Sequence, residues 1–485
     1  MNEPQEFLLT DLYQLAMMQG YVEEGQTDTA VFEFFIRELP PDRGFFMAAG
    51  LEQCLDFLEN LQVSAQDLKW LRESGRFDRQ LLDYLAEFRF TGDVHAMPEG
   101  TIFFPDEPII RVTAPLPEAQ YAETRLLNIL HFQSLIASKA ARMVLAAPDK
   151  TLVDFGLRRA HGGEAGLLAA RASYVAGFAG SATVLAGQQF GVPLYGTMAH
   201  SFIQAFDDET AAFKSFAKAR PEGLILLIDT YDTEAGAKKV VDLEPWLKEQ
   251  GITLRGVRLD SGDLDTLSRS VRRILDDGGM EHVSIFASGG LDEDKLLGFT
   301  RNGAPIDGFG IGTSLTTSSD APGLDCAYKL QEYAGLARRK RSEGKATWPG
   351  RKQVWRNYDS DGRMEGDVLS IEDDCHRGEP LIHLVMKDGK RLRPPTSLED
   401  IRQRSAFELD RLPEPLRRLE DATYPVEVAG ALKKLAQEVD KRLERAASEK
   451  AWPSDPARRV LRRGAGSVHQ TAKAGSHGTE KQCQG

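Results

Sequence analysis

A histidine and four aspartates stand where short apolar segments of the chain give way to polar residues. His200 lies in "GTMAHS", Asp229 and Asp232 lie in "DTYD", and Asp260 and Asp263 lie in "RLDSGD". A histidine at such a position is a structural residue, a general acid or base, or a nucleophile. The carboxylates suit sugar hydroxyls or Mg²⁺, and the alternative is that they cap the helices that follow. Capping is the commoner role of a single aspartate but explains a set of four poorly, so these residues indicate a site.

Arginines and glycines accompany these residues. Arg158, Arg159 and Arg258 carry planar guanidinium groups that suit a carboxylate or a phosphate. The small residues of "ASGG" (287–290) and "GFGIGT" (308–313) let backbone N–H groups approach an anion closely, although many glycine-rich segments are only tight turns. Together these residue types predict a pocket for a phosphorylated sugar and an anionic partner.

The other histidines and the cysteines argue against zinc and against a disulfide framework. No second histidine stands at metal-ligand spacing from His200, and the four cysteines lie far apart in the chain. We therefore assign His95, His131 and His282 to structural roles and expect a reducing, cytoplasmic environment.

Composition narrows the class of partner. The chain has 485 residues, with 60 basic and 73 acidic side chains and a net charge of −13, which argues against non-specific nucleic-acid binding. No apolar run is long enough to span a membrane, and the first residues lack the pattern of a signal peptide. We expect no nucleic-acid partner, no membrane association and a cytoplasmic location.

The elements that must position these residues follow a regular rhythm. Short apolar segments alternate with helical segments, as parallel strands with crossover helices require. This pattern fits either an incomplete α/β barrel or an open doubly wound sheet, and we favour the barrel because polar residues close every strand at the same end. The expected strands are 151–156, 192–198, 224–232, 254–262, 283–290 and 306–313.

The domain organisation is predicted from the surrounding composition. Residues 1–120 form a smaller α/β domain joined by C-terminal segments, and residues 121–335 form the barrel. Residues 336–452 form a mixed C-terminal region, and the basic, glycine- and serine-rich residues 453–485 form a disordered tail.

Six sequence segments carry a resemblance to a known family. The segments "LLTDLYQLAM", "DFGLRRA", "GTMAHSF", "LIDTYDT", "GVRLDSGDL" and "GFGIGTSL" occur in the order and approximate spacing of nicotinate phosphoribosyltransferases. The resemblance implies a type II phosphoribosyltransferase fold, an irregular α/β barrel with a smaller α/β domain, in a homodimer with shared active sites. It also implies that nicotinate and 5-phosphoribosyl-1-pyrophosphate give nicotinate mononucleotide and pyrophosphate, coupled to ATP hydrolysis, in the first step of NAD synthesis from nicotinate.

The same resemblance assigns roles to individual residues. His200 matches the histidine that the family phosphorylates from ATP, and Asp260 and Arg258 are implied to be catalytic. Tyr13 and Arg37 are implied to reach the active site of the partner subunit. The implied nicotinate-binding residues are Tyr13, Phe155, Arg158, Thr197 and Arg258. The implied phosphoribosyl-pyrophosphate-binding residues are Arg37, Asp229, Asp260, Ser288, Gly289, Gly310, Gly312 and Thr313. Mg²⁺ is expected on the substrate's pyrophosphate, with Asp229 and Asp260 as its candidate protein ligands.

Three alternatives stay open. Nicotinamide phosphoribosyltransferases carry an aspartate in a "GTDTV" segment, and the matching "GSATV" here has Ala182 at that position, which favours nicotinate. A quinolinate phosphoribosyltransferase would be shorter and richer in arginine and lysine at the site. A non-catalytic phosphosugar sensor on the same barrel would be expected to lack His200 or Asp260.

Overall fold

The computed structural model describes residues 7–342, 345–420 and 422–449. The chain divides into two compact units, Met1–Ala436 and Gln437–Gly485, and the elements described below belong to the first unit. The predicted tail at 453–485 lies outside the described residues, and the other predicted domain boundaries stay predictions.

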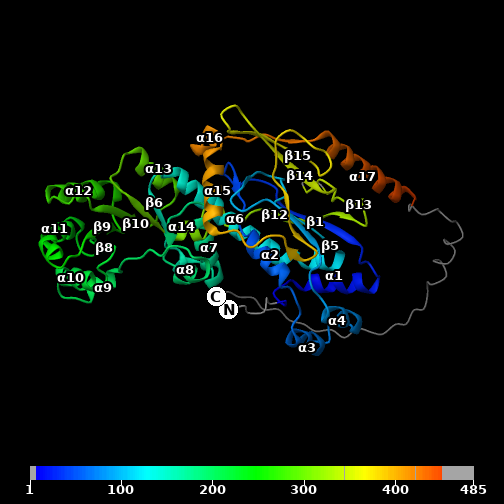
Figure 1. The fold of residues 1–485 in the computed structure, drawn as a ribbon, viewed down its shortest axis with the longest axis horizontal. Coiled ribbons are helices and arrows are strands. Elements are labelled where there is room, and N and C mark those ends of the chain that lie inside the picture. Colours follow the sequence, from blue (N-terminus) through cyan, green and yellow to red (C-terminus); the bar gives the residue numbers. More distant parts are fainter. Residues whose placement is uncertain (1–6, 343–344, 421, 450–485) are drawn as a thin grey trace, which may run out of the picture. The chain divides into compact units, whose positions relative to one another are not determined.

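A six-stranded parallel sheet forms the core of the middle part of this unit in sequence, residues 151–311 (Figure 1). Its helices include α7 (Gly163–Val175), α11 (Thr233–Glu249), α12 (Leu264–Asp277) and α13 (Glu293–Arg301). The sheet begins and ends with different strands rather than closing on itself, so the predicted α/β fold with an incomplete barrel is confirmed. The strand order is β7 (Gly180–Ser181), β6 (Thr151–Asp154), β11 (Gly308–Ile311), β10 (Ser284–Ser288), β9 (Leu254–Leu259) and β8 (Leu224–Leu227).

One predicted strand is wrong. Residues 192–198 form no continuous strand, and only Leu194 makes an isolated parallel bridge, to Ser181 of β7. Pro193 has no backbone N–H to donate, and the side chains of Leu194 and Tyr195 are exposed, so burial does not favour a strand here. The sixth strand is β7, whose two residues are too short for a hydrophobic pattern to reveal.

A seven-stranded sheet organises the other half of the unit. Its order is β13 (Leu336–Ala337), β12 (Cys326–Tyr333), β1 (Thr29–Ile36), β5 (Ile110–Pro115), β3 (Asp93–Ala96), β17 (His383–Lys387) and β18 (Lys390–Arg391). The sheet therefore combines strands from both sides of the parallel sheet in sequence. Two smaller sheets accompany it: β2 (Phe46–Met47) with β4 (Ile102–Phe103), and β16 (Glu379–Pro380), β14 (Lys352–Tyr358), β15 (Met364–Ile371) and β19 (Val426–Val428).

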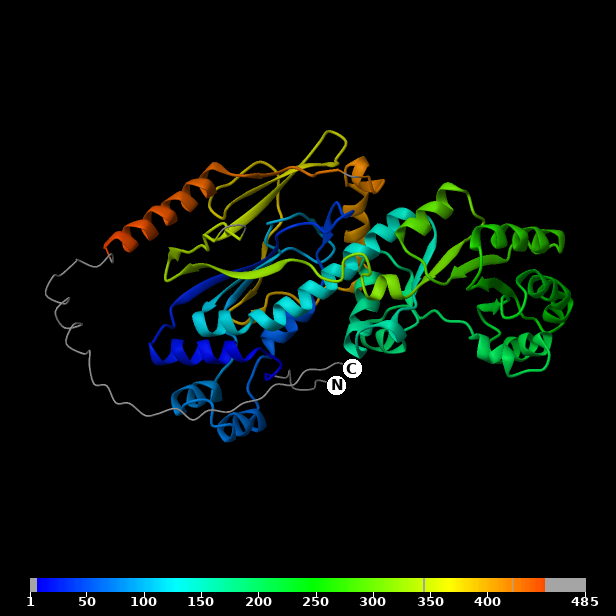
Figure 2. The ribbon, with the colours of Figure 1, turned by 180° about the vertical axis from the view of Figure 1, so that it is seen from behind.

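The long helix α6 (Glu123–Ala146) joins the two halves (Figure 2). Its first half, with Leu126 and Ile129, packs in the hydrophobic core beside the seven-stranded sheet, and its second half, with Ile136 and Met143, packs in the core of the parallel sheet. Burial on most sides explains the weak amphipathic pattern of this helix. Helix α6 is therefore part of the hydrophobic core of both halves.

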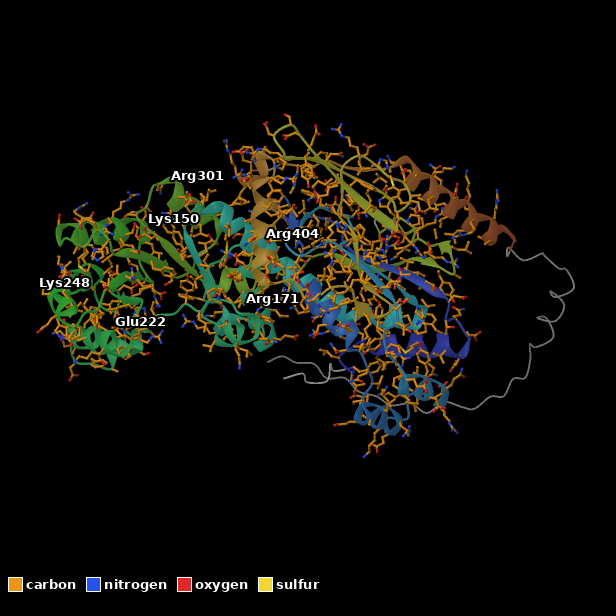
Figure 3. All side chains as sticks on the ribbon, viewed as in Figure 1. Lys150, Arg171, Glu222, Lys248, Arg301 and Arg404 are labelled. Carbon is orange, nitrogen blue, oxygen red and sulfur yellow. The ribbon has the colours of Figure 1, made fainter. Side chains whose placement is uncertain are left out.

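A buried glutamate adds a polar junction between the halves. Arg171 of α7 makes two hydrogen bonds to the Glu99 carboxylate, at 2.7 and 2.9 Å, and Arg404 of α15 (Leu398–Asp410) donates to the Glu99 carbonyl (Figure 3).

None of the described helices is long and apolar enough to cross a membrane.

Candidate active site

The carboxyl edge of the parallel sheet gathers the predicted site residues. Phe155 follows β6, Asp260 follows β9, Ser288 ends β10 and Gly312 follows β11. These strands run parallel and neighbour one another, so their ends lie at one edge of the sheet.

A pocket of about 220 Å³ lies at this edge. Eight of its lining residues are predicted site residues: Phe155, Arg158, Asp260, Ser288, Gly289, Gly310, Gly312 and Thr313. Arg159 and Gly290, which belong to the same sequence segments, also line it. Leu291 and Ser314 complete the lining and were missed, although each directly follows a predicted glycine-rich segment.

Two glycines are required by the shape of this pocket. Gly289 has φ +101°, and a Cβ there would lie 2.1 Å from the Asp260 carbonyl oxygen. A Cβ on Gly310 would lie 2.5 Å from the Phe155 ring. Any side chain at either position would displace the backbone or the aromatic wall, so the glycines keep the pocket open to a bulky anion.

Asp229 and Asp260 form a connected pair at the pocket. The Asp229 Oδ2 accepts hydrogen bonds from the Asp260 N–H and the Ser261 hydroxyl, both at 2.7 Å. The Ser288 hydroxyl in turn donates to Asp260 Oδ1. Asp229 Oδ1 is buried and has no hydrogen-bond partner among the described residues, so one carboxylate oxygen is left for a ligand.

The other two aspartates of the predicted set are helix caps. Asp232 accepts the Ala235 N–H at the start of α11, and Asp263 accepts the Thr266 N–H at the start of α12. The capping interpretation is therefore confirmed for Asp232 and Asp263, whereas Asp229 and Asp260 do not cap a helix.

Arg258 lies within reach of this pair. The Arg258 Nη1 donates to the Thr197 hydroxyl, and Nη2 lies 3.9 Å from Asp260 Oδ1. Burial lowers the pKa of Arg258, and the charges of Asp260 and Asp229 oppose that effect. Its Nε is buried without a hydrogen-bond partner in the described part of the chain. The guanidinium therefore has an unused N–H donor next to two carboxylates, and an anionic ligand can accept a hydrogen bond from it.

His200 is the first residue of the short helix α9 (His200–Gln204). Its Nδ1 lies 3.2 Å from the Thr230 hydroxyl, and its Nε2 lies 3.7 Å from Asp260 Oδ2. The side chain is 37% exposed, which leaves the imidazole accessible to a substrate. Thr230 was not predicted, although it stands within the same "DTYD" segment as Asp229.

Tyr13 and Arg37 do not line this pocket. Tyr13 lies in α1 (Leu12–Glu23), is 46% exposed, and donates its hydroxyl to Glu123 at 3.0 Å. Burial and the Glu123 charge raise the pKa of Tyr13 to about 12. Arg37 follows β1 and forms an ion pair with Asp325. Their predicted roles at the site of a partner subunit stay predictions.

The donor set suits a metal that arrives with substrate. Among the residues that the structure describes, no three or more His, Cys, Asp or Glu side chains are grouped to hold a metal ion by themselves. Mg²⁺ is commonly bound by one or two carboxylates together with substrate phosphates and waters. The free oxygen of Asp229 and the nearby Asp260 fit that arrangement.

Comparisons with known proteins identify three matching regions. Residues 8–131 match the N-terminal domain of nicotinate phosphoribosyltransferase, residues 150–339 match the nicotinate phosphoribosyltransferase family, and residues 371–436 match the C-terminal domain of that enzyme. Together these regions span most of the chain and include every predicted site residue.

Individual relatives agree with these matches. The chain is 50% identical to the nicotinate phosphoribosyltransferase pncB2 of Mycobacterium tuberculosis, over 87% of this chain and 91% of that protein. It is 39% identical to the nicotinate phosphoribosyltransferase of Bacillus subtilis, over 80% and 78% of the two chains. Its fold matches the crystal structure of human nicotinic acid phosphoribosyltransferase with a TM-score of 0.80 and 31% identity, over 89% of this chain and 100% of the other. The chain belongs to the nicotinate phosphoribosyltransferase family.

Proposed function

We propose that this protein transfers the 5-phosphoribosyl group of 5-phosphoribosyl-1-pyrophosphate to nicotinate, coupled to ATP hydrolysis. The observation that carries the proposal is the pocket at the sheet edge, where a glycine cradle, Phe155, Arg158 and Asp260 line one space. A phosphate, a planar ring and a ribose are the ligand parts that this combination suits.

The residues divide between the two substrates. The backbone at Gly289, Gly310 and Gly312 holds the 5-phosphate, because N–H groups beside small residues bind anions closely. Asp229 and Asp260 hold the ribose hydroxyls or the Mg²⁺-bound pyrophosphate. Phe155 stacks on the pyridine ring, and the guanidinium of Arg258 or Arg158 pairs with the nicotinate carboxylate.

The chemistry requires positioning more than proton transfer. The bond between C1 of the ribose and the pyrophosphate oxygen breaks, and the pyridine nitrogen donates its electron pair to C1. Pyrophosphate leaves with the bonding electrons. Mg²⁺, when bound, would offset the negative charge of the pyrophosphate. The pocket contributes by aligning the nitrogen with C1 and by stabilising the positive charge that develops on the sugar.

His200 links this reaction to ATP. A neutral imidazole nitrogen attacks the γ-phosphorus of ATP, ADP leaves, and water later cleaves the phosphohistidine to release phosphate. Asp260 is shared between His200 and the substrate pocket, which supports a connection between phosphorylation and substrate binding.

We further propose a homodimer and a cytoplasmic location. Tyr13 is exposed and lies outside its own chain's pocket, which suits a residue that completes a partner's site. Cys54, Cys326 and Cys375 are free thiols, as expected in a reducing compartment.

The test measures mononucleotide formation from 5-phosphoribosyl-1-pyrophosphate and Mg²⁺ with nicotinate or nicotinamide, each with and without ATP. We expect turnover of nicotinate, stimulated by ATP, and little turnover of nicotinamide. Preference for nicotinamide would overturn the assignment of the acceptor. No product from either base would favour a sensor on the same fold.

A further inference from the structure

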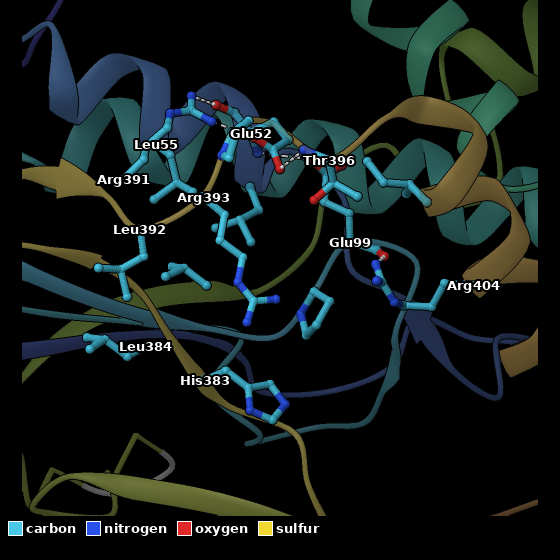
Figure 4. A pocket seen from close by; sticks show the side chains of 15 residues that line it. Glu52, Leu55, Glu99, His383, Leu384, Arg391, Leu392, Arg393, Thr396 and Arg404 are labelled. Atoms are coloured by element: carbon cyan, nitrogen blue, oxygen red, sulfur yellow. Dashed lines mark hydrogen bonds and ion pairs between the residues drawn. The ribbon is translucent and has the colours of Figure 1, made fainter.

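A second cavity, of about 440 Å³, is lined by residues from 51–55, 98–99 and 383–404, and it shares no lining residue with the active-site pocket. Helix α2 (Leu51–Glu59), the 98–99 segment and the segment from β17 to α15 enclose it (Figure 4). Its volume lies in the range of small-molecule sites, about 300–1,000 Å³.

The two acidic side chains of this cavity already have arginine partners. Glu52 is paired with Arg391 at 2.5 Å and accepts the Thr396 N–H, and Arg391 also pairs with Glu59 at 3.3 Å. The Glu99 carboxylate is paired with buried Arg171 and also accepts the N–H groups of Gly50 and Glu52. Neither carboxylate is therefore available to attract a cation.

Two guanidinium groups at the cavity retain unused donors. Arg393 makes no hydrogen bond or ion pair with any residue that the structure describes, and its side chain reaches into the cavity toward His383 (Figure 4). Arg404 uses one nitrogen for the Glu99 carbonyl, at 3.0 Å, and its other donors have no partner among the described residues. An Arg guanidinium carries five N–H donors, so this lining can bind an anionic head group from two sides.

Apolar residues form most of the remaining lining, together with His383 and Thr396. Leu51, Leu55 and Ile401 are buried in the wall, whereas Leu384 and Leu392 are 38% and 50% exposed. Exposed leucines beside unpaired guanidinium groups offer apolar contact area next to a positive charge.

The geometry points to a binding site for a small organic anion, with its carboxylate or phosphate head on Arg393 and Arg404 and its apolar body against Leu384 and Leu392. This site is separate from the proposed reaction and does not depend on it.

The test titrates the full-length protein with hexanoate, hexyl phosphate and neutral 1-hexanol by isothermal titration calorimetry. We expect at least one anion to bind, with 1-hexanol at least about tenfold weaker, because the neutral alcohol cannot accept a charge-assisted hydrogen bond as a carboxylate or phosphate does. The relative affinities of hexanoate and hexyl phosphate identify the preferred head group.

Substitutions of Arg393 test whether the anion binds in this cavity. Arg393→Glu and the milder Arg393→Gln should each weaken anion binding about tenfold or more, whereas Arg79→Glu on the exposed face of α4 (Arg79–Ala86) should leave it unchanged. Turnover of nicotinate without the anion should be the same in all three variants, which confirms that they fold. Equal binding of 1-hexanol, or anion binding that survives both Arg393 variants, would overturn the proposal, as would binding of neither anion.

Discussion

His200 and Asp260 face each other across the carboxyl edge of the parallel sheet, with His200 Nε2 3.7 Å from Asp260 Oδ2. On its other side the imidazole contacts the Thr230 hydroxyl through Nδ1, at 3.2 Å. The ring is therefore oriented by two polar partners while its surface stays accessible, which is the arrangement that a transiently modified histidine needs.

Replacing His200 with alanine should separate transfer from ATP coupling. We expect His200→Ala to retain slow phosphoribosyl transfer, because the pocket residues stay in place, and to lose the stimulation by ATP. Rates measured with and without ATP, together with ³²P transfer from γ-labelled ATP, check this. An unchanged response to ATP in the variant would contradict the phosphohistidine role.

Replacing Asp229 should damage the site more than replacing a neighbouring aspartate. Asp229→Asn loses the charge that accepts the Asp260 N–H and the Ser261 hydroxyl, so we expect kcat/KM for 5-phosphoribosyl-1-pyrophosphate to fall about ten- to hundredfold. Asp232→Asn is the matched control, because asparagine caps a helix as well as aspartate does. Equal losses in the two variants would show that Asp229 has no special role.

Ala182 provides a test of base selection. Its N–H donates to the Asp154 carbonyl at 2.9 Å, which holds it beside the strand end that carries Phe155. We expect Ala182→Asp to lower kcat/KM for nicotinate by charge repulsion and to raise the relative rate with nicotinamide. Ala182→Asn, of similar size but neutral, separates charge from bulk. If both variants keep the original preference, the base is selected elsewhere.

Lys139 connects the parts of the chain that follow the two glycine-rich segments, 287–290 and 308–313. Its side chain is 1% exposed and contacts Glu293 of α13 at 2.8 Å and Asp320, which follows α14 (Thr313–Thr316), at 2.6 Å. Lys139→Met leaves buried Glu293 with only the more distant Arg142, at 3.7 Å, so we expect the free energy of unfolding to fall by about 3 kcal/mol. Urea unfolding measures this loss.

A double variant and a control distinguish the charge from the packing at this position. Lys139→Met with Glu293→Gln should recover part of the lost stability, because the buried carboxylate that lost its lysine is then replaced by a neutral amide. Lys69→Met breaks an ion pair with Glu73 in which the two side chains are 72% and 65% exposed, so its effect should be smaller. A loss in Lys69→Met equal to that in Lys139→Met would contradict this account.

His95 should make stability depend on pH. Burial and the Arg111 charge lower the pKa of His95 from its ordinary 6.5 to about 4, against the opposing charge of Glu372. The unfolded chain therefore takes up this proton first, so stability is full above pH 6.5 and falls as the pH drops from 6.5 to about 4. Between pH 7.5 and pH 5 the expected loss is about 2 kcal/mol.

Urea unfolding at the two pH values tests this assignment. His95→Gln should abolish that part of the loss, whereas His282→Gln, at an exposed position, should leave it unchanged. The same pH dependence in His95→Gln as in the parent protein would assign the loss to other groups.

Part of the pocket lining could be predicted from strand positions alone. Parallel strands bring their carboxyl ends to one edge, so the polar residues after each apolar segment gather there, and the pocket is lined by Phe155, Asp260, Ser288 and Gly310. The role of His200 is expected only from the family resemblance, because strand periodicity cannot supply it.

Which of the aspartates cap a helix could not be predicted from their spacing in the sequence. Asp229 and Asp232 stand three residues apart in one segment, yet Asp232 caps α11 whereas Asp229 turns toward Asp260, because the helix begins after Asp232. The junction of Lys139 with Glu293 and Asp320 joins residues more than 150 positions apart, and no local pattern encodes such a contact. Local spacing determines secondary structure and strand ends, whereas partners in a buried network are selected by packing between distant elements.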